Sequence, residues 1–139
     1  MNLSAAEIDI LFDAVEDYAP LWDAKWECGR QKCGVAEAEL IHQGQAAIAK
    51  LIELSLISLQ WDSLQDTPVE IVPEQTLELL QQAKYWSPSE VEGSLTICFS
   101  ATDKGKETFR TNEQIKAYYR SEEFAFRYPA PEWHPMKRI

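Results

Sequence analysis

The chain has 139 residues, of which 45% are hydrophobic, and a formal net charge of −10. This length is typical of one domain and this composition supplies a hydrophobic core, which excludes disorder along the whole chain. The acidity disfavours general binding of nucleic acid, because a negative surface is repelled by phosphates.

The first predicted element is a helix over residues 4–18. Ser4 and Glu7 form a capping box at its start, and apolar residues then recur at helical spacing. The acidic residues of this helix, including Asp9 and Asp13, are expected on its solvent side. The sequence therefore predicts an ordinary amphipathic helix that packs on a core through one face.

Two further helices are predicted before the first strand. Pro20 ends the first helix and starts the second, in which Trp22 and Trp26 supply the apolar stripe. The third is long, over residues 35–58, and Gly44 on its apolar face would let another helix approach closely. These patterns predict a core of three helices.

The pattern then changes from helical spacing to near alternation. The segments "LISLQWD" and "SLTICFS" predict a pair of antiparallel strands, and the residues between them predict a short strand at 69–72 and an inserted helix that begins at Pro73. After the second strand, "DKGKETFRT" and "NEQIKAYYRSEEF" predict one or two terminal helices. The last fifteen residues, rich in proline and aromatics, predict an extended tail.

Two segments resemble the winged-helix superfamily. "AIAKLIELSLISL" (47–59) is similar to the end of a recognition helix and the first wing strand, although Ser55 stands where that family prefers glycine. "ATDKGKETF" (101–109) is similar to the Thr-x-x-Gly turn that follows the second wing strand. "LELLQQAKYWSPS" is similar to a segment of small bacterial winged-helix-like proteins. The resemblance implies a winged-helix fold with a long insertion in the wing.

We therefore expect an α+β, mostly helical fold. It would have a winged-helix-like three-helix core and a small antiparallel β-hairpin carrying an inserted helix. The expected boundaries, within a single domain over 1–139, are a three-helix core at 4–54, wing strands at 56–101 with the inserted helix at 73–84, C-terminal helices at 103–122, and an extended tail at 123–139. An α+β domain whose strands pair for structural reasons alone is the alternative.

The resemblance implies DNA recognition through the third helix and the segment after the wing. The candidate contacts are His42, Gln43 and Lys50 on the helix, and Lys104, Lys106 and Arg110 in the following segment. The outer face of the helix also carries Glu39 and Glu53, which disfavours a phosphate-binding surface. A solvated polar face explains the same residues equally well.

No motif for catalysis or cofactor binding is present, so an enzyme is not expected. Cys28, Cys33, His42 and Cys98 form only half of a zinc signature, and no metal or cofactor is predicted. With an odd number of cysteines, an acidic start and no apolar run of about 18 residues, the sequence predicts a cytoplasmic protein without a membrane span.

The expected function is a non-enzymatic binding module that contacts another protein. Net charges of −6 over 1–27 and −7 over 62–103 favour a basic partner. Tyr85, Trp86 and Trp133 lie at element ends and are candidates for the partner surface, with packing in the core or tail as the alternative.

A DNA-binding regulator is the main alternative, and a small-ligand sensor with a pocket lined by tryptophans is a third. The sequence also leaves a homodimer open.

Overall fold

The computed structural model describes residues 1–63, 66–89 and 94–129. The fold is α+β, as the sequence predicts. In chain order the elements are α1 (Ala5–Glu16), β1 (Ala19–Pro20), α2 (Leu21–Gly29), α3 (Glu37–Glu53), β2 (Ile57–Ser63), β3 (Asp66–Glu70), α4 (Pro73–Leu80), the 3₁₀ helix η1 (Ala83–Trp86), β4 (Thr96–Ala101), α5 (Asp103–Thr111), α6 (Glu113–Tyr119) and α7 (Glu122–Arg127).

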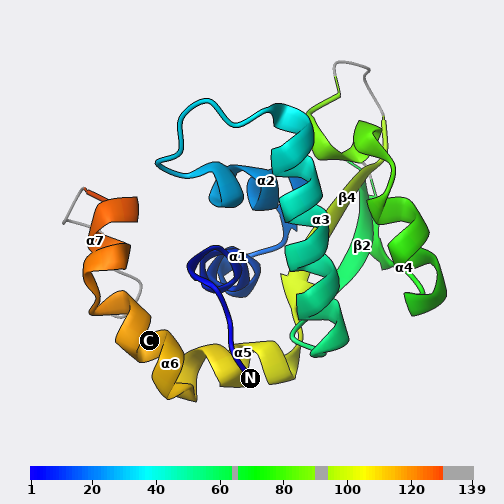
Figure 1. Cartoon of the computed structure of the whole chain (residues 1–139). Helices are drawn as coiled ribbons and strands as arrows, with labels where there is room; N and C mark the ends of the chain where they lie inside the picture. Colours follow the sequence, from blue (N-terminus) through cyan, green and yellow to red (C-terminus); the bar gives the residue numbers. More distant parts are fainter. Residues whose placement is uncertain (64–65, 90–93, 130–139) are drawn as a thin grey trace.

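Helix α1 lies at the centre of the arrangement (Figure 1). Helices α2 and α3 lie beside α1. Helix α4 lies at one edge of the molecule, with α3 between it and α1. Helices α5, α6 and α7 form a curved arm that runs from the end of β4 around α1. The arm and α4 therefore lie on opposite sides of the three-helix centre.

Within the described residues the strands form one antiparallel sheet in the order β1-β4-β2-β3. The expected pair of β2 and β4 is confirmed, with Leu59 opposite Phe99. The two-residue strand β1 was not predicted; its Ala19 pairs with Phe99 on the other side of β4. Strand β3 lies at an edge and contains Pro68, a residue that edge strands tolerate because its missing N–H removes no ladder bond on the outer side.

The long third helix ends at Glu53, earlier than its apolar pattern suggested. Ser55 adopts a left-handed conformation, with φ of 62°. The amide of Leu56 then donates a hydrogen bond to the carbonyl of Leu51, 2.9 Å away, which closes the helix end. The resemblance had placed Ser55 at a position that favours glycine, and its backbone conformation has the corresponding strain.

Two boundaries in the second half of the chain were wrong. The inserted helix expected at 73–84 ends at Leu80 and is followed by η1, whose last residue, Trp86, is completely buried. The tail expected from residue 123 onward is helical up to Arg127, because Ser121 caps α7 by accepting a hydrogen bond from the Phe124 amide. Residues 130–139 of that tail lie outside the described residues.

The two segments that resemble winged-helix proteins contact each other. Thr102 accepts a hydrogen bond from the Gly105 amide and donates one to the Ser55 carbonyl, 2.6 Å away. A Cβ atom on Gly105 would lie 2.0 Å from the Leu56 carbonyl oxygen, so only glycine fits there. The Thr-x-x-Gly turn therefore fastens the start of α5 to the end of α3.

Gly44 permits a close approach, but by a side chain and not by another helix. A Cβ atom at this position would lie 2.6 Å from Trp86 Cζ3. Trp86 fills this gap and donates a hydrogen bond from Nε1 to the Leu80 carbonyl, 2.9 Å away. The segment inserted between β2 and β4 is thereby packed against α3.

Candidate protein-interaction surface

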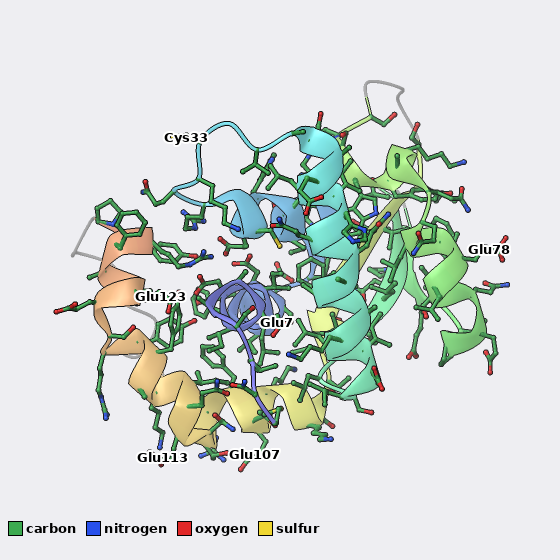
Figure 2. All side chains as sticks on the ribbon, viewed as in Figure 1. Glu7, Cys33, Glu78, Glu107, Glu113 and Glu123 are labelled. Atoms are coloured by element: carbon green, nitrogen blue, oxygen red, sulfur yellow. The ribbon has the colours of Figure 1, made fainter. Side chains whose placement is uncertain are left out.

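Strand β3 and helix α4 present exposed apolar side chains among exposed acids. The side chains of Val69, Val72 and Leu77 are 61%, 50% and 63% exposed. We call the exposed side chains of this unit the acidic insert surface: Val69, Glu70, Val72, Glu74, Leu77 and Glu78. Figure 2 shows Glu78 projecting from α4, away from the rest of the molecule. Val69 and Glu70 are consecutive in the strand and point to opposite faces of the sheet, so these residues are grouped by their shared element and exposure. Large exposed apolar side chains within one such unit are a feature of protein-binding surfaces.

The unit is firmly held by its other face. The amide of Ile71 donates to the Leu59 carbonyl of β2, 2.9 Å away, and Ile71 itself is buried. Thr76 and Leu80 are the buried residues of α4, and Pro73 occupies its first turn, where no amide is needed. Leu77 of α4, by contrast, is on the solvent side.

A small hollow separates α4 from α3. Its volume is about 160 Å³. The lining residues are His42, Gln45, Ala46 and Ala49 of α3, and Leu77, Leu80 and Gln81 of the insert. The hollow is therefore mainly aliphatic at its walls, with three polar side chains.

The structure does not assemble the aromatic partner surface predicted from the sequence. Trp86 is 0% exposed, so its assignment to a partner surface was wrong; packing over Gly44 is the physical reason. Tyr85 is half-buried against Trp61, with ring centroids 5.6 Å apart. Trp133 lies outside the described residues. An exposed tryptophan occurs instead at Trp26, which is 54% exposed although the helical pattern directed it to the core.

The candidate DNA contacts of α3 differ in their availability. His42 is exposed and lines the hollow beside α4. Gln43 donates a hydrogen bond to Glu39, 3.2 Å away. Lys50 lies 2.9 Å from the Glu7 carboxylate and donates to the Asn2 carbonyl, 2.7 Å away. The only lysine of the proposed reading face thus binds the start of α1.

The basic cluster after the sheet is also engaged within the molecule. Lys104 donates to the Leu54 carbonyl at the end of α3, 3.0 Å away. Arg110 pairs with Glu107, one turn before it on α5. Lys106 is exposed. Lys104 and Arg110 therefore stabilise helices in the described structure, and contacts with phosphates would compete with these roles.

A buried group of charged residues between α1, α2 and α7 was not anticipated. Asp9 was expected in solvent but is 1% exposed. Its carboxylate lies 2.8 Å from Nη2 of Arg127 and accepts a hydrogen bond from the Tyr118 hydroxyl, also 2.8 Å away. Arg127 in turn donates to the carbonyl of Glu27, 2.9 Å away. The partners of Asp9 therefore lie more than a hundred positions away in the sequence, and no local sequence pattern indicates them.

The same region brings several carboxyl groups together. Burial is the main reason that the pKa of Asp9 rises to about 7, although the neighbouring Arg127 acts in the opposite direction. The pKa of Asp13 is raised further, first by burial and then by the charge of Glu27, with which it shares a hydrogen bond. The raised pKa favours the protonated form of Asp13, whose hydroxyl group can then donate the hydrogen bond to the Glu27 side chain.

Glu27 is tied to the C-terminal arm by a second set of contacts. Its carboxylate accepts hydrogen bonds from the Tyr128 hydroxyl at 3.0 and 3.1 Å and lies 2.7 Å from the Arg30 guanidinium. The Arg30 guanidinium lies 4.1 Å from the centre of the Tyr128 ring. Two arginines and two tyrosine hydroxyls thus satisfy the buried carboxylates, which makes this cluster a structural joint.

A larger open pocket, of about 510 Å³, lies between the start of α1, α3 and α7. Its residues are Ser4, Ala5, Ala6, Glu7, Cys28, Lys32, Gln43, Ala46, Ala47, Lys50, Glu123 and Arg127. The ligand sensor considered from the sequence would need a pocket lined by tryptophans, and this pocket is lined by none of the described tryptophans.

The cysteines are all unpaired, with Cys28 and Cys98 buried and Cys33 exposed. Burial raises the pKa of Cys28 to about 11 and that of Cys98 to about 12, so both are thiols at neutral pH. Among the residues that the structure describes, no group of three or more His, Cys, Asp or Glu side chains has an arrangement able to hold a metal ion.

Comparison with known proteins finds no family model, curated protein or solved structure that matches this chain. Over the described parts of the chain, no helix combines the length and the apolar character needed to cross a membrane.

Proposed function

We propose that this protein is a non-enzymatic module that binds a basic protein partner through the acidic insert surface. The observation that carries the proposal is the presence of large exposed apolar side chains among exposed acids on β3, α4 and the turn between them. Apolar contacts would supply affinity, whereas the carboxylates would steer and orient a positively charged partner. Two buried thiols and an unpaired Cys33 are compatible with the reducing cytoplasm, where we expect the protein to act.

We also propose that the fold is related to winged-helix domains. Three features support this relationship: a short strand between the first two helices, its pairing with the returning strand β4, and the Thr102–Gly105 turn that follows β4. The insertion between β2 and β4 would then be an elaborated wing, and the acidic insert surface would lie on the element that differs most from the parent fold.

The arrangement of cations favours a protein partner over DNA. Lys50, Lys104 and Arg110 bind groups of the same chain, and Glu39 and Glu53 are exposed on α3. A DNA-binding protein needs cations that are free to displace counterions from phosphates, with about 6–10 phosphate contacts in typical cases. The exposed acidic residues of the insert are negatively charged and would repel phosphates.

Selection from a phage-displayed library of random 16-residue peptides tests the proposal and does not require the partner to be identified first. We expect enriched peptides that combine lysine or arginine with apolar residues. Their binding should fall at least tenfold in the double variant Glu74→Lys, Glu78→Lys. The result that would overturn the proposal is the absence of enriched basic peptides, or equal binding to this variant.

The matched control is Glu122→Lys, Glu123→Lys. It makes the same change in net charge at two exposed helical residues, but on α7, where Figure 2 labels Glu123. Binding that falls equally in both double variants would indicate a nonspecific effect of charge and would count against the insert.

Fluorescence anisotropy with labelled mixed DNA fragments tests the alternative function, a DNA-binding regulator. We expect no binding at about 50 mM salt, where electrostatic binding to DNA is strong, and none at about 200 mM. Tight, salt-sensitive binding that is lost in Lys104→Glu, Lys106→Glu would instead establish a nucleic-acid-binding protein.

A further inference from the structure

We propose that the hollow between α3 and α4 receives one apolar side chain of the partner, presented by a helix with basic flanks. This inference rests on the proposed function and adds to it the recognition site and the form of the partner segment. It assigns an anchoring role to a place that the sequence pattern did not indicate.

The size of the hollow fits a single large apolar side chain. Its volume is about 160 Å³. For comparison, an engineered apolar cavity of about 150 Å³ in another protein binds benzene. A phenyl ring or a branched aliphatic side chain is therefore of the right size, and a whole peptide segment is not.

The walls are suited to such a side chain. Ala46 and Ala49 form the α3 side, and Leu77 and Leu80 form the α4 side. Leu80 is 1% exposed and lies deep, whereas Leu77 is 63% exposed and forms the rim. An entering side chain would cover Leu77 and would remove apolar surface from water on both helices, which is the usual source of affinity at an interface anchor.

The hollow is preformed, because both helices are fixed on either side of it. The carbonyl of Leu80 accepts a hydrogen bond from Gln45 of α3 at 2.8 Å and one from Trp86 at 2.9 Å. Trp86 also fills the gap over Gly44, one residue before Gln45. The distance between α3 and the end of α4 is therefore set in the free protein, and binding needs little ordering.

Acidic residues flank the hollow on both helices. On α3, residues 42, 46, 49 and 53 follow helical spacing along one face, which places the exposed Glu53 beyond Ala49 and the exposed Glu39 near His42. On α4, the exposed Glu74 lies three residues before Leu77, on the same face of the helix. Basic residues on either side of the partner's apolar anchor would meet these carboxylates, and such a pattern is typical of a basic amphipathic helix.

The first experiment tests the hollow alone, with toluene as the probe. In ¹H–¹³C NMR spectra of the methyl groups, toluene should cause saturable shifts at Ala46, Ala49, Leu77 and Leu80. Ala46 borders both this hollow and the larger pocket, whereas Ala49 borders the hollow and not that pocket. The variants Ala46→Trp and Ala49→Trp should each abolish these shifts, because an indole would block the hollow. Ala117→Trp, at an exposed position of α6, is the matched control and should leave them unchanged.

The second experiment uses the highest-affinity 16-residue peptide from the phage selection. Replacing its single most buried apolar residue by alanine should weaken binding at least tenfold, as should Ala46→Trp and Ala49→Trp in the protein. Circular dichroism should show that the peptide becomes helical on binding, and Ala117→Trp should have no effect.

The outcomes distinguish the two proposals. If toluene shifts none of the four residues, or if both Ala46→Trp and Ala49→Trp leave peptide binding unchanged, the anchor site is wrong while the insert can still bind basic proteins. If toluene binds but selection yields no basic peptides, the proposed function is wrong and so is the partner assigned to the hollow. A bound peptide that remains extended would overturn the helical form of the partner.

Discussion

Helix α5 joins the body of the protein through backbone groups at the end of α3, whereas α7 joins it through long side chains that reach α1 and α2. At the first joint, Thr102 and Gly105 contact the carbonyls of Ser55 and Leu56. At the second, Arg127 spans the distance to Asp9 and Glu27. The first joint depends on the absence of a side chain, and the second on a long charged one.

The difference shows how far each joint could be inferred from sequence. A cap and a glycine three residues apart form a local motif, and the motif predicts the start of α5 whatever its partner is. A buried ion pair depends on which distant residue supplies the opposite charge. The two joints should therefore fail in different ways when they are altered, and the following predictions test this from the largest effect to the smallest.

The largest loss is expected at the second joint. Arg127→Met leaves the Asp9 carboxylate buried without its cation, and breaking a buried pair in this way costs about 3–5 kcal/mol. Urea denaturation followed by circular dichroism measures the free energy of unfolding. The control is Arg110→Met, whose pair with Glu107 is exposed and should contribute about 0–1 kcal/mol. Similar losses in both variants would refute a special role for the buried pair.

At the first joint, Gly105→Ala should cost about 1–3 kcal/mol, because the new methyl group forces apart α5 and the carbonyl of Leu56. Lys106→Ala, at the next residue, is exposed and should change stability by less than about 0.5 kcal/mol. The same denaturation experiment compares them. If Gly105→Ala is as mild as its neighbour, the close approach does not determine the position of α5.

The second joint should also respond to pH. The folded state holds protons on Asp9 and Asp13 to a higher pH than the unfolded chain, whose aspartates have pKa values near 3.8. Their contribution is therefore fully present below about pH 4 and is lost as the pH rises, through about 7 for Asp9 and higher for Asp13. Each retained proton corresponds to about 1.4 kcal/mol of stability per pH unit.

Unfolding free energies at pH 5.5, 7 and 8.5 would measure this loss. Asp13→Asn keeps a neutral hydrogen-bond donor beside Glu27, so the variant should show a shallower decline and be more stable than the unmodified protein at the highest pH. A stability that rises between pH 5.5 and 8.5 would contradict the assignment of these protons.

The smallest effect concerns the left-handed residue at the end of α3. Ser55→Gly should stabilise the protein by about 0.5–1 kcal/mol, because glycine adopts φ of 62° without steric cost. Ser58→Gly, in β2, is the same substitution in an extended conformation and should destabilise by a similar amount. Effects of equal sign at both positions would show that backbone strain at Ser55 is not significant.

The parts of the fold that follow local rules were predictable. Ser4 and Glu7 do form a capping box, and α5 begins at Asp103, directly after Thr102, as its motif indicates. The same rules wrongly placed Asp9 in solvent, because a helical pattern assigns an acidic residue to the polar face without showing what lies against that face. Whether that acid faces water or an arginine depends on Arg127, which is 118 positions away.

The candidate surface was predictable only in its charge. The acidity of the insert could be counted from the sequence, but the identity of its exposed apolar residues could not. Leu77 and Trp86 are both apolar and both belong to the insert, and the structure exposes one and buries the other. The decisive feature is the space above Gly44, which accepts one large ring and fixes the orientation of α4.

The pairing of Asp9 with Arg127 has a consequence for the order of events during protein synthesis. At about 5–20 residues per second, the ribosome adds Arg127 roughly 6–24 s after Asp9. Throughout that interval α1 carries a carboxylate that its docked position would bury without a cation. Docking of α1 before that moment would leave Asp9 either charged without its cation or protonated, so we expect the final packing of α1 to be completed only when Arg127 is available.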